Sequence, residues 1–175
     1  MEFVRIGDKI IDRDKIIRTI DRIFEIRSEG FSQSETASMV GTDRTFVSRL
    51  ETMGEVRKGS KIALVGFPIL NKEEVNDFSV SQGLDKVWVM NDVERWEYIK
   101  GRTGEELLAD IVSLIAELQE LDYIIFIGSD LRIRMMEATM GNKVVGIEIG
   151  KSPIETDVKI DIEELRKIIE CIRRA

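Results

Sequence analysis

The sequence predicts an α/β fold, in which a small helical domain with a β-hairpin precedes a parallel sheet that has helices on both faces. Three observations support this prediction. From residue 60 onward, short apolar runs alternate with amphipathic helical patterns, which is typical of parallel strands buried between two layers of helices. Before residue 60, helical periodicity follows one short segment of alternating polarity. The 175 residues, of which 43% are hydrophobic, are enough for one compact domain or two small ones.

The first part of the chain is expected to contain a hairpin and then helices. Residues 3–11 alternate apolar and polar side chains around Gly7, which favours two short strands joined by a tight turn. Asp12 is placed to cap a helix with apolar residues at helical spacing, and Gly30 is placed to end it. Two shorter helices are expected over residues 32–39 and 43–51.

A polar stretch with two glycines, residues 54–60, is interpreted as a domain boundary. It separates a domain of residues 1–59 from one of residues 60–175. Strands of the second domain are expected over 61–66, 86–90, 123–127 and 143–149, with a short fifth over 157–160. Helices are expected over 71–82, from 91 to about 100, and over 104–120, 130–140 and 161–174, with Asn71 as a cap. This alternation predicts a Rossmann-like or flavodoxin-like parallel sheet with helices on both faces.

The charge of the chain also differs between the two predicted domains. The chain contains 26 Lys and Arg against 33 Asp and Glu, a formal net charge of −7. Residues 1–59 hold 11 basic and 11 acidic side chains, whereas residues 60–175 hold 15 and 22. A neutral module attached to an acidic one binds DNA when its positive side chains share one face. The alternative is ordinary variation between two protein surfaces.

Scarce residue types exclude several classes of function. The chain has no histidine and one cysteine, Cys171, which excludes zinc sites built from these residues, Ser-His-Asp triads and Cys-His dyads. It lacks the G-x-G-x-x-G and Walker A patterns of nucleotide-binding loops. We therefore expect no catalytic site, no metal and no cofactor.

The same features indicate a cytoplasmic protein. A lone cysteine fits a reducing compartment. No apolar run approaches the roughly 20 residues of a spanning helix, and the first eight residues lack the basic and apolar regions of a signal peptide. We expect neither a leader nor contact with a membrane.

The most specific signal is the segment of residues 31–51. Ala37 suits a close crossing of two helices, Gly41 suits a turn that needs a positive φ, and Asp43 is placed to cap the second helix. The side chains expected to face the core are Met39, Val47 and Leu50.

This segment resembles the helix-turn-helix of the Cro/repressor-like (XRE) transcriptional regulators, which carry Ser-Gln at the start of the first helix and a Val/Ile-Ser-Arg-Leu/Ile-Glu run in the recognition helix. Those pieces are here Ser32, Gln33 and residues 47–51. The resemblance extends over residues 12–51. Such domains usually continue into two further helices, whereas Gly54 follows at once here, so the resemblance implies a three-helix version with a hairpin. The alternative is a pair of helices that merely packs.

The resemblance implies roles for individual side chains. Gln33 is expected to contact a phosphate. The outward side chains of the second helix are Arg44, Thr45, Ser48 and Arg49, and the two arginines and Thr45 are expected to reach base edges in the major groove. Phe46 has two candidate roles, a contact with a thymine methyl or a place in the core. Arg57 and Lys58 are either contacts to a neighbouring phosphate or part of a solvated linker.

In the second domain, the carboxyl ends of the strands are the expected place for a ligand, because doubly wound sheets bind ligands there. The expected effector site consists of Gly66, Phe67, Gly128, Ser129 and Asp130. It favours a small anionic or hydroxylated ligand with one acidic group. The alternative is that Phe67 and Leu131 fill the crevice and that the domain only dimerises.

Other side chains of this domain have simpler expectations. Trp88 is expected in the core, and Trp96 and Tyr98 are expected to line a pocket or an interface. Nothing in the spacing of Asp92, Asp130 and Glu148 requires them to gather around a magnesium ion, and each also suits ordinary turn and cap chemistry.

Together these observations predict a DNA-binding transcriptional regulator that is not an enzyme. Its expected partners are double-stranded DNA, a second copy of the chain in a homodimer, and a small-molecule effector. One alternative is a small α/β enzyme, or a protein that binds a nucleotide or phosphometabolite, with an accessory helical domain. Another is a pure oligomerisation module.

Overall fold

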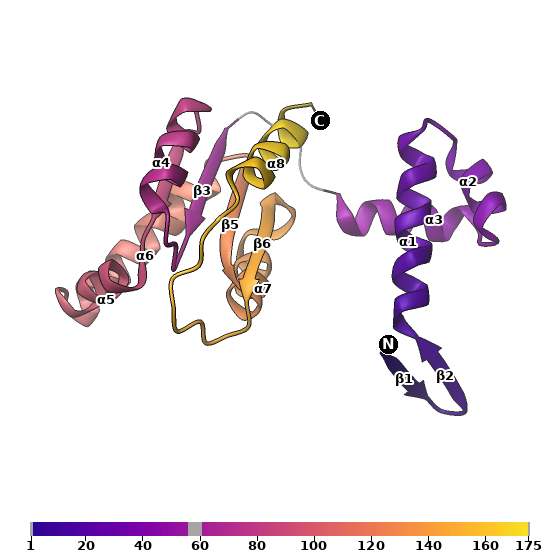
Figure 1. Ribbon diagram of the computed structural model, residues 1–175, viewed down its shortest axis with the longest axis horizontal. Coiled ribbons are helices and arrows are strands. Elements are labelled where there is room, and N and C mark those ends of the chain that lie inside the picture. Colours follow the sequence, from indigo (N-terminus) through magenta and orange to yellow (C-terminus); the bar gives the residue numbers. More distant parts are fainter. Residues whose placement is uncertain (1, 56–60, 175) are drawn as a thin grey trace. The chain divides into compact units, whose positions relative to one another are not determined.

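The structure is a computed structural model that describes residues 2–55 and 61–174 (Figure 1). The chain divides after Glu55 into two compact units, an N-terminal and a C-terminal one. The predicted domain boundary between residues 59 and 60 lies outside the described residues, as do Arg57 and Lys58. Within the described ranges, no helix is both long enough and apolar enough to cross a membrane.

The N-terminal unit begins with the predicted hairpin. Strand β1 (Phe3–Ile6) pairs with β2 (Lys9–Asp12) in antiparallel register, so that Phe3 lies opposite Asp12. Gly7 in the turn has a φ of +59°, a conformation that glycine adopts without strain.

Helices α1 (Arg13–Ser28), α2 (Gln33–Val40) and α3 (Arg44–Gly54) follow the hairpin. The Asp12 carboxylate accepts a hydrogen bond from the Lys15 amide (3.0 Å), which confirms the predicted cap of α1. The core of the unit consists of Ile23, Ala37, Val47 and Leu50, with Ile20 and Val40 packed against them. The prediction for Met39 is wrong, because its side chain is 56% exposed.

The C-terminal unit contains a parallel sheet, which has four strands in the described part of the chain. Strands β3 (Ile62–Gly66), β4 (Lys86–Val89), β5 (Tyr123–Ser129) and β6 (Val144–Gly150) lie in the order β4-β3-β5-β6. All three neighbouring pairs are parallel. The expected fifth strand over residues 157–160 is reduced to one bridge, in which Val158 pairs with Ile69.

Helices cover both faces of this sheet, as the apolar strands predict. They are α4 (Lys72–Ser81), α5 (Asp92–Lys100), α6 (Gly104–Gln119), α7 (Asp130–Met140) and α8 (Ile162–Arg174), with a 3-10 turn over Gly141–Lys143. On one face, Leu64 and Ile125 pack with Val75 of α4 and with Leu165 and Ile169 of α8. On the other face, Val65 and Phe126 pack with Leu118 of α6 and with Ile133 and Met140 of α7. Neighbouring strand residues thus contact opposite layers, which explains why the strands are continuously apolar.

Asn71 does not cap α4, although its position predicts that it does. Its side-chain amide instead donates to the Ile160 carbonyl (3.0 Å) and accepts from the Ile160 amide (2.8 Å). These two bonds attach the segment before α8 to the start of α4. Because the Asn71 oxygen is used in this way, it forms no cap bond to its own helix.

Candidate functional site

In the N-terminal unit, local hydrogen bonds fix the connection between α2 and α3. The Ser32 hydroxyl accepts from the Glu35 amide (3.2 Å), and the Glu35 carboxylate accepts from the Ser32 amide (2.8 Å). Gly41 ends α2 with φ +74° and ψ +38°, and the Asp43 carboxylate accepts from the Phe46 amide (2.8 Å) to start α3. The predicted roles of Gly41 and Asp43 are confirmed.

Ala37 lies where α2 meets its neighbours. It is only 3% exposed and belongs to the same cluster as Ile23 of α1 and Val47 of α3. A longer side chain at this point would have to displace these helices, because a packed core leaves few voids. The small residue therefore sets how closely α2 approaches α1 and α3.

The outward face of α3 carries the side chains expected to contact DNA. Arg44, Thr45 and Arg49 are exposed, and Ser48 is half-buried. Neither arginine forms an ion pair with another described residue. Phe46 is 39% exposed and lies outside the core cluster, so its alternative place in the core is wrong and a base contact remains a prediction.

Gln33, the expected phosphate contact, belongs to a network that joins the three helices. Arg27 of α1 forms an ion pair with Glu51 of α3, and Gln33 Nε2 donates to Glu51 Oε2 (2.7 Å). The hydrogen bond from Arg27 lowers the pKa of the Glu51 carboxyl, and the bond from Gln33 adds to this shift. A glutamine amide has two N–H donors, and Glu51 accepts from one of those of Gln33. Sequence reasoning gave Arg27 and Glu51 no role, because nothing local in the sequence joins residues that distant.

In the C-terminal unit, the predicted strand-end site is largely closed. A Cβ on Gly66 would lie 2.7 Å from Ile69 Cδ1, and one on Gly128 would lie 2.9 Å from Phe126 Cε1. Ser129 is fully buried, and its hydroxyl has no hydrogen-bond partner among the described residues. Gly66, Gly128 and Ser129 are thus packed closely against neighbouring protein atoms.

Asp130 occupies the anion position at the start of α7 with its own carboxylate. This carboxylate accepts from the Ser152 amide (2.9 Å) and lies 3.5 Å from Arg134 and 3.8 Å from Lys151. The pKa of Asp130 is lowered chiefly by the hydrogen bond from Ser152, and also by the Leu131 amide and the two cations. The Asp130 carboxylate is therefore already engaged with a backbone amide and two cations of the protein.

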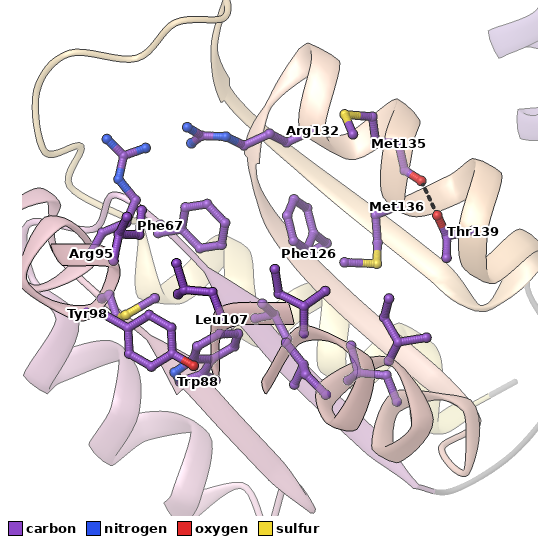
Figure 2. A pocket seen from close by; sticks show the side chains of 17 residues that line it. Phe67, Trp88, Arg95, Tyr98, Leu107, Phe126, Arg132, Met135, Met136 and Thr139 are labelled. Carbon is purple, nitrogen blue, oxygen red and sulfur yellow. Dashed lines mark hydrogen bonds between the residues drawn. The ribbon is translucent and has the colours of Figure 1, made fainter. Parts of the chain in front are cut away.

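A cavity of about 420 Å³ lies instead on the face of the sheet that α6 and α7 cover (Figure 2). Of the five residues of the predicted effector site, Phe67 alone lines it, and its ring meets that of Phe126 edge to face at 6.0 Å. We call this cavity the apolar pocket. Its lining residues are Val65, Phe67, Trp88, Met90, Arg95, Tyr98, Ile99, Leu107, Ile111, Leu114, Ile115, Leu118, Phe126, Arg132, Met135, Met136 and Thr139.

The aromatic side chains of β4 and α5 form one wall of the apolar pocket. Trp88 was expected in the core but is half-buried, and its ring meets the ring of Tyr98 at 5.8 Å. Tyr98 lines the pocket, as predicted, while its hydroxyl donates to Asp110 (2.6 Å). Trp96 lies outside this lining, is 47% exposed, and has the guanidinium of Arg95 5.1 Å from its ring centre.

Two arginines lie at one end of the apolar pocket. The Arg132 guanidinium is 5.0 Å from the ring centre of Phe67, and Arg95 forms an ion pair with Asp92 (2.5 Å). Arg95 Nε and Arg132 Nη1 are buried, and neither has a hydrogen-bond partner among the described residues. Burial lowers the pKa of Arg132, and so does the nearby charge of Arg95, while Asp92 acts in the opposite direction.

The carboxylates considered for a magnesium site do not gather. Asp92 pairs with Arg95, Asp130 binds the Ser152 amide, and Glu148 pairs with Lys151 (3.0 Å). Among the described residues, no three acidic or cysteine side chains are placed together to hold a metal ion.

No protein-family model, curated protein or solved structure matches the chain. The chemistry of both units therefore has to be inferred from their own geometry.

Proposed function

We propose that the chain is a DNA-binding transcriptional regulator and that its N-terminal unit is a helix-turn-helix domain, with α3 as the recognition helix. The observation that carries this proposal is the outward face of α3, on which Arg44, Thr45 and Arg49 are exposed while Val47 and Leu50 are buried on the other side of the helix. An arginine is suited to the paired acceptors of guanine in the major groove. The short connection through Gly41 sets the direction in which α3 projects.

The charges of the α2–α3 segment favour the same function. Its acidic side chains are engaged within the protein, since Glu35 and Asp43 cap the two helices and Glu51 holds Arg27 and Gln33. Its two arginines have no ion-pair partner among the described residues. An approaching duplex thus meets two arginines that have no ion-pair partner among the described residues, while the Glu51 charge is compensated by Arg27 and the N-terminal part of the chain is neutral in total.

A single short recognition helix contacts too few base pairs for useful specificity, so we propose that the regulator acts as a homodimer. Two-fold pairing would place the half-sites one helical turn, about 34 Å, apart. The C-terminal unit is the proposed source of the interface. It leaves large apolar side chains exposed on α5 and α6, among them Val93, Leu108 and Val112.

The test begins with selection of bound duplexes from a random pool, followed by titration of the preferred duplex at several salt concentrations. We expect Arg44→Ala and Arg49→Ala each to weaken binding by about 1–3 kcal/mol, and Gln33→Ala to weaken binding to all duplexes alike. Arg174→Ala is the matched control, since it removes one exposed positive charge from the C-terminal unit. If both arginine variants of α3 bind the selected duplex as tightly as the parent, the proposal fails.

A further inference from the structure

We propose that the apolar pocket of the C-terminal unit binds a monocarboxylate of about eight to twelve carbons in total, most of them in an apolar body. The body would lie between the sheet and α6, and the carboxylate would lie between Arg95 and Arg132. This inference goes beyond the DNA-binding proposal and does not rest on it, because every residue that carries it belongs to the C-terminal unit.

The wall of the pocket is suited to hydrocarbon. Val65 and Phe126 come from the sheet, Ile111 and Leu114 from α6, and Met136 from α7 (Figure 2). Thioether side chains are unbranched and adjust to irregular apolar shapes. A ligand without a sizeable apolar body would leave this wall in contact with water.

The polar groups of the lining are mostly already used within the protein. The Thr139 hydroxyl donates to the Met135 carbonyl (2.8 Å), and the Tyr98 hydroxyl donates to Asp110. Two polar groups of the lining remain unused, the Nε of Arg95 and the Nη1 of Arg132. Both are buried, and neither has a hydrogen-bond acceptor among the described residues. A buried donor without an acceptor is costly, and a ligand that brings an oxygen to it removes this cost.

The charge at this end of the pocket favours an anion with one negative charge. Figure 2 shows both guanidinium groups at the same end, beside Phe67. Asp92 compensates one of the two positive charges through its ion pair with Arg95, whose side chain is 13% exposed. The charge of Arg132 remains, and a carboxylate matches a guanidinium in both geometry and charge.

The size of the pocket limits the ligand. A volume of about 420 Å³, at about 30 Å³ for each water-sized group, holds on the order of ten to fourteen non-hydrogen atoms. Octanoate and 2-naphthoate both fall in this range and represent a chain and a ring system with the same acidic group. A nucleotide is a poorer fit, because the lining offers no free groups for a sugar and the acidic domain repels several negative charges.

The test is titration calorimetry of the full chain, without DNA, with octanoate, 2-naphthoate, 1-octanol and octylammonium. We expect at least one carboxylate to bind with one site per chain. The neutral and cationic octyl compounds should bind at least about tenfold more weakly than octanoate. Arg132→Met keeps the length of the side chain and should remove this preference for the carboxylate. The control Arg134→Met makes the same change two residues further along α7, outside the lining, and should not alter binding.

A second pair of variants tests the location. Ile111→Trp places a large ring in the pocket from a half-exposed position and should abolish binding, whereas Ala109→Trp on the same helix is at an exposed position outside the lining and should not. Thermal denaturation of each variant identifies any that fails to fold. The proposal is overturned if neither carboxylate binds at concentrations up to about 1 mM, if octanol binds as well as octanoate, or if folded Ile111→Trp still binds. Light scattering of the same samples shows whether a second copy covers the pocket and prevents binding, which would equally overturn it.

Discussion

The conformation of Gly41 gives a prediction about the N-terminal unit that separates backbone strain from packing. Gly41 has φ +74° and ψ +38°, and a Cβ built on it would meet nothing within 4 Å. An alanine here therefore clashes with no neighbour, and its whole effect comes from the left-handed backbone. That conformation costs a residue with a Cβ about 1–2 kcal/mol, of which a less flexible unfolded chain returns about 0.4–1 kcal/mol.

We therefore expect Gly41→Ala to lower the free energy of unfolding of the N-terminal unit by about 1 kcal/mol, or about 4–8 °C in Tm for a domain of this size. Gly41→Asn should lose about half as much, because asparagine adopts this conformation more readily. Gly54→Ala is the control. It makes the same chemical change at the end of α3, where the surroundings are also open and φ is not positive, and should leave the stability unchanged or slightly higher.

The assay uses the placement of the aromatic residues. Both tryptophans, Trp88 and Trp96, belong to the C-terminal unit, so their fluorescence reports the unfolding of that unit. Circular dichroism reports the helices of both units. Urea titration should move the dichroism transition in the Gly41 variants while the fluorescence transition stays in place. If Ala and Asn destabilise equally, or if Ala costs nothing, the left-handed conformation is not what makes glycine necessary.

Three further predictions concern other contacts. The pKa of Glu51 lies below its ordinary value of 4.5, so its contribution to stability is complete above pH 4.5 and is lost as the pH falls through the pKa of the folded state. Glu51→Gln should therefore make the stability of the N-terminal unit, followed by circular dichroism, fall less steeply at acidic pH. An unchanged dependence on pH would contradict this. Asn71→Ala leaves the Ile160 amide and carbonyl without their partner and should cost the C-terminal unit about 1–3 kcal/mol in urea titrations followed by fluorescence, with Asn71→Asp intermediate. A Cβ on Gly146 would lie 2.5 Å from Ile133 Cγ2, so Gly146→Ala should cost about 1–3 kcal/mol, and adding Ile133→Ala should cost less than the sum of the two single changes.

The order of helices and strands could be predicted because local chemistry decides most of their ends. Asp12 and Asp43 accept hydrogen bonds from their own helices, and Gly41 has the positive φ that its place in a turn predicts. Each of these signals acts within about one helical turn. A single sequence is sufficient for such features, since cause and effect are neighbours in the chain.

Two wrong predictions have one physical cause. Residues 157–160 were expected to form a strand, and Asn71 was expected to cap α4. In the structure, the Asn71 side chain binds the amide and the carbonyl of Ile160. This takes up the amide and carbonyl of Ile160, so that they cannot extend the pairing beyond the Val158 bridge, and it takes up the oxygen that a cap would use. A contact between residues so far apart in sequence leaves no periodic trace, so neither error could be avoided from the sequence.

The apolar pocket was missed for a different reason, which the helix α6 illustrates. Its broad apolar face was predicted correctly, but of its side chains Leu118 alone is buried. Leu114 and Ile115 are half-buried along the pocket, whereas Leu108 is 64% and Val112 57% exposed. The sheet therefore covers only part of the apolar face of α6, at Leu118, and leaves the rest of that face partly or largely exposed. Hydrophobic periodicity records which side chains avoid water and says nothing about what replaces the water. On α6 the sheet replaces the water around Leu118. We propose that the apolar body of the ligand replaces it along Ile111 and Leu114, and that another copy of the chain replaces it around the neighbouring Leu108 and Val112.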